Sequence, residues 1–179
     1  SKFMSEQIIR DCEKAFGLKS VCLRYFNVAG AAENGSNGQK TQNATHLIKV
    51  ASQVACGKKD GLSIFGTDYP TPDGTGVRDY IHVEDLADLH LLALQYLASN
   101  NPSDIFNCGY GRGYSVKEVI RAVEKISHKK IHVTNQDRRN GDAASLIANS
   151  QKIRERFQWT PRRDSLELIC QTAYNWEKR

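Results

Sequence analysis

The sequence has no apolar stretch long enough to span a bilayer and no segment that resembles a secretory signal peptide, so a membrane partner is not expected. Paired cysteines are absent too. The five cysteines are odd in number and scattered, at Cys12, Cys22, Cys56, Cys108 and Cys170. This pattern argues against a disulfide framework or a structural metal site. Reduced thiols in a cytoplasmic protein are the expectation.

The patterns typical of nucleic-acid binding are missing as well. The formal net charge is +5, but the basic pairs lie far apart, are flanked by acids and have no aromatic residues between them. Nucleic acid is therefore not expected as a partner. The chain has no internal repeat and no low-complexity tract, and its 179 residues suffice for a domain with a sizeable core.

Helix and strand patterns alternate along the chain, which predicts an α/β fold. Apolar residues at helical spacing predict helices over 2–16, 44–56 and 84–98, and Ser115 with Glu118 forms a capping box for another. Two more helices are expected, from about Ser150 and from the capping pair Asp164 and Glu167. Short apolar runs predict strands over 21–25, 62–65, 77–83, 104–108 and 131–134. Residues 28–42 are rich in glycine and asparagine and predict a long loop with a functional or mobile role.

The stretch from Asp73 to Asp88 is the most informative one. Its glycines, Gly74 and Gly76, allow a turn that approaches a ligand closely, and Arg78 follows at the start of an apolar strand. The planar guanidinium of Arg78 could bind a carboxylate or a phosphate. On the residues alone, a small anionic ligand site and a hairpin whose arginine only pairs with Asp79 or Glu84 are equally compatible with the pattern.

A resemblance favours the ligand site. The segment DGTGVRDYIHVEDLADLH (73–90) resembles the signature of UDP-glucose 4-epimerases, which belong to the extended short-chain dehydrogenase/reductase family. Further segments resemble that family in the same order: Ser1-Lys2, LRYFNVAG (23–30), THLI (45–48), IFGTDY (64–69) and RRNGD (138–142). The resemblance thus covers the chain from its first residue to its last predicted helix.

The resemblance also implies what the 179 residues do not contain. The family opens with a Rossmann half whose glycine-rich turn seats the pyrophosphate of NAD, and no such turn occurs here. The family's catalytic lysine follows four residues after a catalytic tyrosine, and only Ser1-Lys2 of that motif is present. The expectation is the C-terminal half of an epimerase, inactive by itself. Residues 1–27 and about 79–109 would be remnants of the NAD-binding Rossmann domain, and about 28–78 and 110–179 the UDP-sugar-binding domain.

The resemblance assigns roles to individual residues. Lys2 would be the catalytic lysine and would also contact NAD, whose nicotinamide lies beside Tyr25 and Phe26. Asn27 and Arg78 would hold the substrate phosphates, and Leu146 would limit the space beside the sugar. The remaining substrate-binding residues would be His46 and Leu47 before a helix, Ser63, Ile64 and Phe65 along the uracil-binding strand, and Arg139 with Asp142 at the phosphate and ribose. A metal role for His46 is not expected, since no second histidine stands at ligand spacing.

The implied function is the interconversion of UDP-glucose and UDP-galactose with NAD as cofactor, by an enzyme that is a homodimer when full length. Two alternatives stay open. One is a fragment of an epimerase for UDP-N-acetylhexosamines, because Leu146 is intermediate between the bulky and small residues of the family at that place. The other is a stand-alone, non-catalytic UDP-binding module. A catalytic role for Tyr80 or His82 is not expected, since packed side chains are the simpler interpretation.

Overall fold

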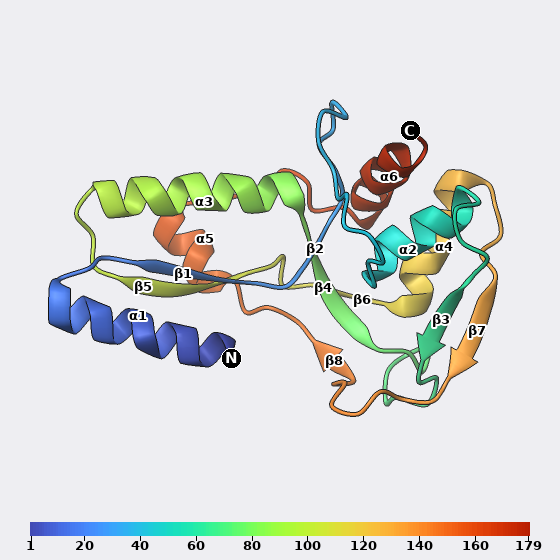
Figure 1. Cartoon of the computed structure of the whole chain (residues 1–179), viewed down its shortest axis with the longest axis horizontal. Helices are drawn as coiled ribbons and strands as arrows, with labels where there is room; N and C mark the ends of the chain where they lie inside the picture. The colour runs from blue at the N-terminus through green and yellow to red at the C-terminus, as the bar shows by residue number, and fades with distance from the viewer.

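Helices and strands alternate along the whole chain in the computed structural model, which describes residues 1–179 (Figure 1). The helices are α1 (Lys2–Phe16), α2 (Leu47–Ala55), α3 (Val83–Ala98), α4 (Val116–Ser127), α5 (Gln151–Phe157) and α6 (Leu166–Glu177). The strands are β1 (Val21–Tyr25), β2 (Asn27–Ala29), β3 (Leu62–Phe65), β4 (Val77–His82), β5 (Asp104–Cys108), β6 (Gly113–Ser115), β7 (Val133–Gln136) and β8 (Ser145–Leu146). The predicted α/β class is confirmed.

Several predicted boundaries differ from the structure. The helix expected over 44–56 spans only Leu47–Ala55. The strand expected over 131–134 spans Val133–Gln136, because parallel pairing with β3 places Val133 opposite Leu62 and Gln136 opposite Phe65. The last helix is capped by Ser165 rather than Asp164. The Ser165 hydroxyl accepts from the Leu168 N–H, whereas Asp164 binds the guanidinium of Arg112.

One lobe of the molecule is built on the parallel pair β1–β5 (Figure 1). Helix α3 lies on one face of this pair and α1 on the other. Phe106 of β5 is buried and packs edge to face against Tyr96 of α3, and Phe157 of α5 lies against both rings. Helix α5 therefore belongs with this lobe in space, although the sequence grouped it with the second unit. The division into two domains stays a prediction.

Strand β4 connects the two lobes. Its carboxyl half pairs in parallel with β2, from Asn27 opposite Tyr80 to Ala29 opposite His82. Its amino half pairs antiparallel with β6 and parallel with β8. The residues of β4 thus lie where the lobes meet.

The second lobe holds the parallel pair β3–β7 and the helices α2, α4 and α6, which pack on one another (Figure 1). The largest cluster of buried apolar residues runs from these helices into both lobes and includes Ile48, Ile81, Val123 and Ile169. Helix α4 starts with the predicted capping box between Ser115 and Glu118. No helix is long and apolar enough to cross a membrane.

Candidate functional site

A cavity of about 770 Å³ opens beside β4 and receives residues from both lobes. Its volume falls within the range of about 300–1,000 Å³ that is typical of small-molecule sites. All residues that the sequence singled out as cofactor- or substrate-binding line this cavity, except Lys2 and Leu146. Those that do are Tyr25, Phe26, Asn27, His46, Leu47, Ser63, Ile64, Phe65, Arg78, Arg139 and Asp142.

The loop before β4 is held rigidly. The Asp73 carboxylate accepts from the N–H and hydroxyl of Thr75, at 2.9 and 2.6 Å, and from the Ser115 hydroxyl. Burial opposes ionisation of Asp73, but these hydrogen bonds outweigh it and lower its pKa below the usual value. Gly74 has a φ of +80°, and a Cβ there would lie 2.2 Å from the Thr67 carbonyl oxygen, so only glycine fits. The loop therefore fixes the point at which the chain enters β4 with Arg78.

Arg78 lines the cavity and pairs with neither Asp79 nor Glu84. Its Nη1 donates to the Val77 carbonyl at 2.8 Å, and its Nη2 lies 3.8 Å from Oδ1 of Asp142. The hairpin interpretation, in which Arg78 only pairs with Asp79 or Glu84, does not describe this geometry. Asp79 is instead fully buried and accepts from the N–H groups of Tyr110, Gly111 and Ala148, at 3.0, 2.9 and 3.2 Å. Burial raises the pKa of Asp79 even though these three bonds oppose it.

A second arginine shares the carboxylate of Asp142. Arg139 Nε lies 3.1 Å from its Oδ2, and the Arg139 guanidinium carbon lies 4.4 Å from the centroid of the Phe65 ring. On the adjacent β3 positions, Ser63 forms a hydrogen bond with Thr134 across the strand pair and Ile64 is buried. The cavity therefore combines two arginines, one carboxylate and an aromatic ring.

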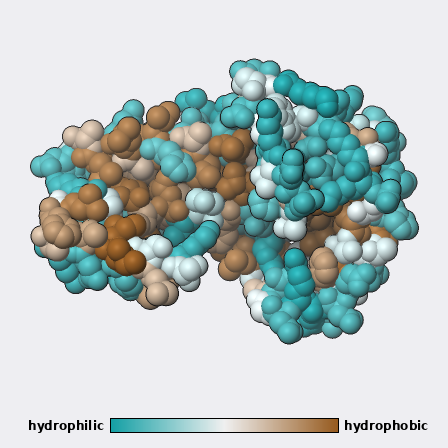
Figure 2. Space-filling view, in the orientation of Figure 1, coloured by the Kyte–Doolittle hydropathy of each residue, from teal (hydrophilic) through white to brown (hydrophobic).

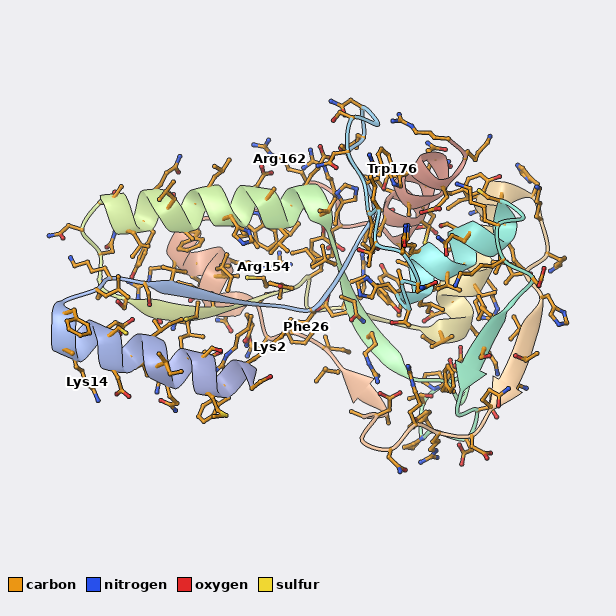
Figure 3. All side chains as sticks on the ribbon, in the orientation of Figure 1. Lys2, Lys14, Phe26, Arg154, Arg162 and Trp176 are labelled. Atoms are coloured by element: carbon orange, nitrogen blue, oxygen red, sulfur yellow. The ribbon has the colours of Figure 1, made fainter.

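The chain bends at Phe26, at the carboxyl end of β1. The Phe26 N–H donates to the Cys108 carbonyl at 3.1 Å, and from Asn27 the chain pairs with β4 instead of β5. The sequence predicted a strand over 21–25, which is present as β1, and a loop from residue 28, whereas a second short strand, β2, starts at Asn27. Lys2 stands at the start of α1, and its Nζ lies 5.5 Å from the centroid of the half-exposed Tyr25 ring (Figure 3).

His46 and Leu47 lie at the start of α2. His46 is the residue before the first turn, with an extended backbone, but its side chain makes no capping hydrogen bond. Leu146 is on β8, opposite Arg78 in the register, and about half of it is exposed at 52 %. Its side chain is not part of the cavity wall, so the sugar-size role implied by the resemblance stays a prediction.

The structure adds cavity residues that the sequence did not indicate. They include Gln39 in the loop after β2, Lys49 of α2, and Trp176 and Glu177 at the end of α6. No sequence motif could have indicated them as one group, because they come from three segments far apart in the sequence. The buried ion pair between Lys49 Nζ and Glu177 Oε1, at 2.5 Å, is the clearest sign that they belong together.

Tyr80 and His82 are buried, in line with the interpretation of packed side chains. Burial raises the pKa of Tyr80 well above the usual range, so its hydroxyl stays protonated. No group of three or more histidine, cysteine, aspartate or glutamate side chains is arranged to hold a metal ion.

The open parallel strands, the helices on their faces and a cavity at the carboxyl end of β1 define a Rossmann-type α/β protein. Residues 1–109 match the profile of the NAD dependent epimerase/dehydratase family, and the chain belongs to that family.

The chain is similar to proteins named as epimerases of nucleotide sugars. It is 54 % identical to a UDP-glucose 4-epimerase of Azospirillum brasilense over 99 % of its length and 51 % of that protein. The crystal structure of UDP-glucose 4-epimerase from Brucella ovis in complex with NAD superposes with a TM-score of 0.95, at 37 % identity, covering 99 % of this chain and 55 % of that one. The UDP-Glc/GlcNAc 4-epimerase of Campylobacter jejuni gives a TM-score of 0.81 at 51 % identity, with coverage of 99 % and 54 %. The chain spans about half the length of these relatives.

Proposed function

We propose that this chain forms the nucleotide-sugar-binding part of a UDP-glucose 4-epimerase, which interconverts UDP-glucose and UDP-galactose. The observation that carries the proposal is the convergence of Arg78, Arg139 and Asp142 on one cavity with the ring of Phe65. Similarity to relatives named UDP-glucose 4-epimerase supports it.

The charges in the cavity suit a diphosphate. Two guanidinium groups face one carboxylate, so the group carries an excess positive charge for an anionic ligand. In this proposal Arg78 and Asn27 bind phosphate oxygens, and Arg139 with Asp142 binds phosphate and ribose. The strand positions Ser63, Ile64 and Phe65 form the wall against the uracil. A firmly held nucleotide would leave the sugar free to rotate at the other end.

The residues at the end of β1 fit only one part of NAD. Tyr25 and Phe26 border the cavity, and Lys2 lies against Tyr25, as a contact with the nicotinamide end would require. The glycine-rich turn that would seat the pyrophosphate does not occur in the 179 residues. When bound, NAD supplies the acceptor and donor of the hydride in this reaction class.

Calorimetric titration of the chain with UDP, and separately with NAD, tests the proposal. UDP binding that Arg78→Ala strongly weakens, with no heat from NAD, is the expected result. Absence of UDP binding would remove the support that the cavity gives to the proposal.

We also expect these 179 residues alone not to interconvert UDP-glucose and UDP-galactose. The tyrosine that the resemblance places four residues before Lys2 would lie outside them, so the proton acceptor for the sugar hydroxyl is missing. A coupled assay for UDP-glucose formation measures this, and turnover above background would contradict it.

The two alternatives have less support. A stand-alone binding module would not need the Lys2 context that resembles the catalytic helix of the family. An enzyme specific for UDP-N-acetylhexosamines is less well supported, because relatives 47–54 % identical to the chain are named UDP-glucose 4-epimerase.

A further inference from the structure

Gln39 is held in place by the end of the C-terminal helix. Its backbone carbonyl accepts from Lys49 Nζ at 2.7 Å and from Trp176 Nε1 at 3.2 Å. Lys49 is itself buried against Glu177. The preceding Gly38 lies flat on the indole, since a Cβ at that position would come within 2.3 Å of the Trp176 ring. Trp176 is labelled in Figure 3, on α6 beside the loop that carries Gln39. The position of Gln39 is thus fixed by two helices.

The side chain of Gln39 reaches His46. Its Nε2 lies 3.1 Å from Nδ1 of the imidazole. In this orientation of the Gln39 amide the nitrogen donates and Nδ1 accepts, which places the proton of the neutral ring on Nε2. His46 Nε2 has no hydrogen-bond partner within the chain, and the side chain does not cap α2. His46 lines the cavity. It therefore offers a free N–H donor in the wall of the cavity.

We propose that Gln39 is a positioning residue that fixes His46 in the Nε2–H tautomer, so that His46 donates a hydrogen bond to an oxygen of the bound nucleotide sugar. The inference rests on the proposed function and deepens it, since it gives Trp176 and Glu177 of α6 a role in the site. Lys49, Trp176 and Glu177 set the position of Gln39, and Gln39 sets the chemistry of His46. His46 is itself exposed, and the buried ion pair between Lys49 and Glu177 supports its partner Gln39 from behind.

The first test measures the tautomer without any ligand. The two ring nitrogens of His46 are observed by ¹⁵N NMR, and the signals are assigned by their loss in His46→Asn. We expect the proton on Nε2 in the wild-type chain. In Gln39→Leu both tautomers should be populated, and in Gln39→Glu the proton should move to Nδ1, because a carboxylate only accepts. Gln42→Leu, an exposed glutamine of the same loop that is outside the cavity wall, should match the wild type. A wild-type proton on Nδ1, or a tautomer that ignores Gln39, would overturn the proposal.

The second test separates an effect through His46 from a general effect on the loop. Gln39→Leu should weaken UDP binding by about threefold to tenfold, the effect of one hydrogen bond. In the His46→Asn background the same substitution should cause no further loss, since an asparagine keeps a donor that needs no tautomer. Equal losses in both backgrounds would mean that Gln39 only supports the loop, and would overturn the proposal.

The two tests also separate this inference from the proposed function. A wild-type chain that fails to bind UDP would remove the proposed function, and with it the ligand contact of His46. The tautomer measurement would still decide whether Gln39 controls the imidazole. UDP binding together with the Nδ1–H tautomer would leave the proposed function intact and overturn the inference alone.

Discussion

The guanidinium of Arg78 and the carboxylate of Asp142 lie 3.8 Å apart, between Nη2 and Oδ1, although one is on β4 and the other in the loop after β7. The same carboxylate receives Arg139 at 3.1 Å. The side chains of Arg78 and Asp142 are 21 % and 32 % exposed, so this group is reachable by a ligand. One carboxylate pairs with both arginines, so the group keeps a net positive charge.

Arg78→Ala should weaken UDP binding by about 10-fold to 100-fold, since charge-assisted hydrogen bonds contribute roughly 1.5–3 kcal/mol. Arg78→Lys should recover only part of the loss, because an ammonium lacks the planar fork. Isothermal titration calorimetry measures both. The matched control is Arg112→Ala, which removes an arginine that pairs with Asp164 outside the cavity wall. Equal affinity for the Arg78 and Arg112 variants would exclude Arg78 from the phosphate site.

The free energy of unfolding should fall as the pH drops below about 6.5, the usual pKa of histidine, because of His82. Its ring is fully buried, with Nδ1 accepting from the Glu84 N–H and Nε2 beside the Thr172 hydroxyl, both at 3.2 Å. Burial lowers the pKa of His82, against the opposing effect of Glu84. As the pH falls, the unfolded chain therefore takes up a proton at a pH where the folded chain does not. The stability that His82 contributes is fully present above the pKa of histidine in the unfolded chain and is lost below it.

Urea unfolding at a series of pH values, from neutral to mildly acidic, measures this dependence. His82→Gln should be less stable overall but should lose much of the slope, since glutamine does not titrate. His90→Gln, on the helix α3 that follows His82, is the control, because that side chain is exposed. An unchanged slope in His82→Gln would assign the acid sensitivity to other groups.

Asp85→Ala should destabilise the fold by about 3–5 kcal/mol, because it removes the buried partner of a charge pair and leaves buried donors without an acceptor. Asp85 is fully buried and accepts from the Tyr110 hydroxyl at 2.7 Å, and from the N–H and Nη1 of Arg163, both at 3.0 Å. Asp88 lies one turn further along α3, 3.6 Å from the same guanidinium but 43 % exposed. Asp88→Ala should therefore change the free energy of unfolding by no more than about 1 kcal/mol. Similar losses for the two variants would contradict this ranking.

Local patterns predicted most of the fold. The strand over 62–65, the capping box at Ser115 and the helix over 2–16 are present as expected, because each depends on neighbouring residues only. The short strand β2, at the start of the expected loop, could not be foreseen. It depends on where Cys108 and Tyr80 offer their backbone groups to the chain at Phe26 and Asn27.

The same distinction applies to the candidate site. Arg78, Phe65 and Asp142 stand in motifs that the resemblance covers, and the sequence could indicate them. Gln39 and Trp176 could not be found in this way, since their contact depends on how α6 packs against the loop after β2. Gly38 gave no signal either, because its need for glycine comes from the Trp176 ring and not from its own backbone.

Helix α1 should be the least protected helix in hydrogen exchange. None of its residues is buried, and Phe3, Met4 and Ile8 are 62 %, 67 % and 63 % exposed. Figure 2 shows apolar side chains on the surface of the lobe that contains α1. The helix is tied to the strand β1 by the exposed ion pair between Glu6 and Arg24, and such pairs contribute little. Helix α4, by contrast, has a capping box and buries Val119 and Val123 completely.

Amide exchange followed by mass spectrometry should show α1 exchanging much faster than α4 in dilute solution. Arg24→Ala should speed exchange in α1 further and leave α4 unchanged. Protection of α1 that rises with protein concentration would mean that a second copy covers the apolar face, because only association depends on concentration. Protection equal to that of α4 at every concentration would contradict the prediction, since contacts within this chain would then stabilise α1 more than its exposed surface indicates.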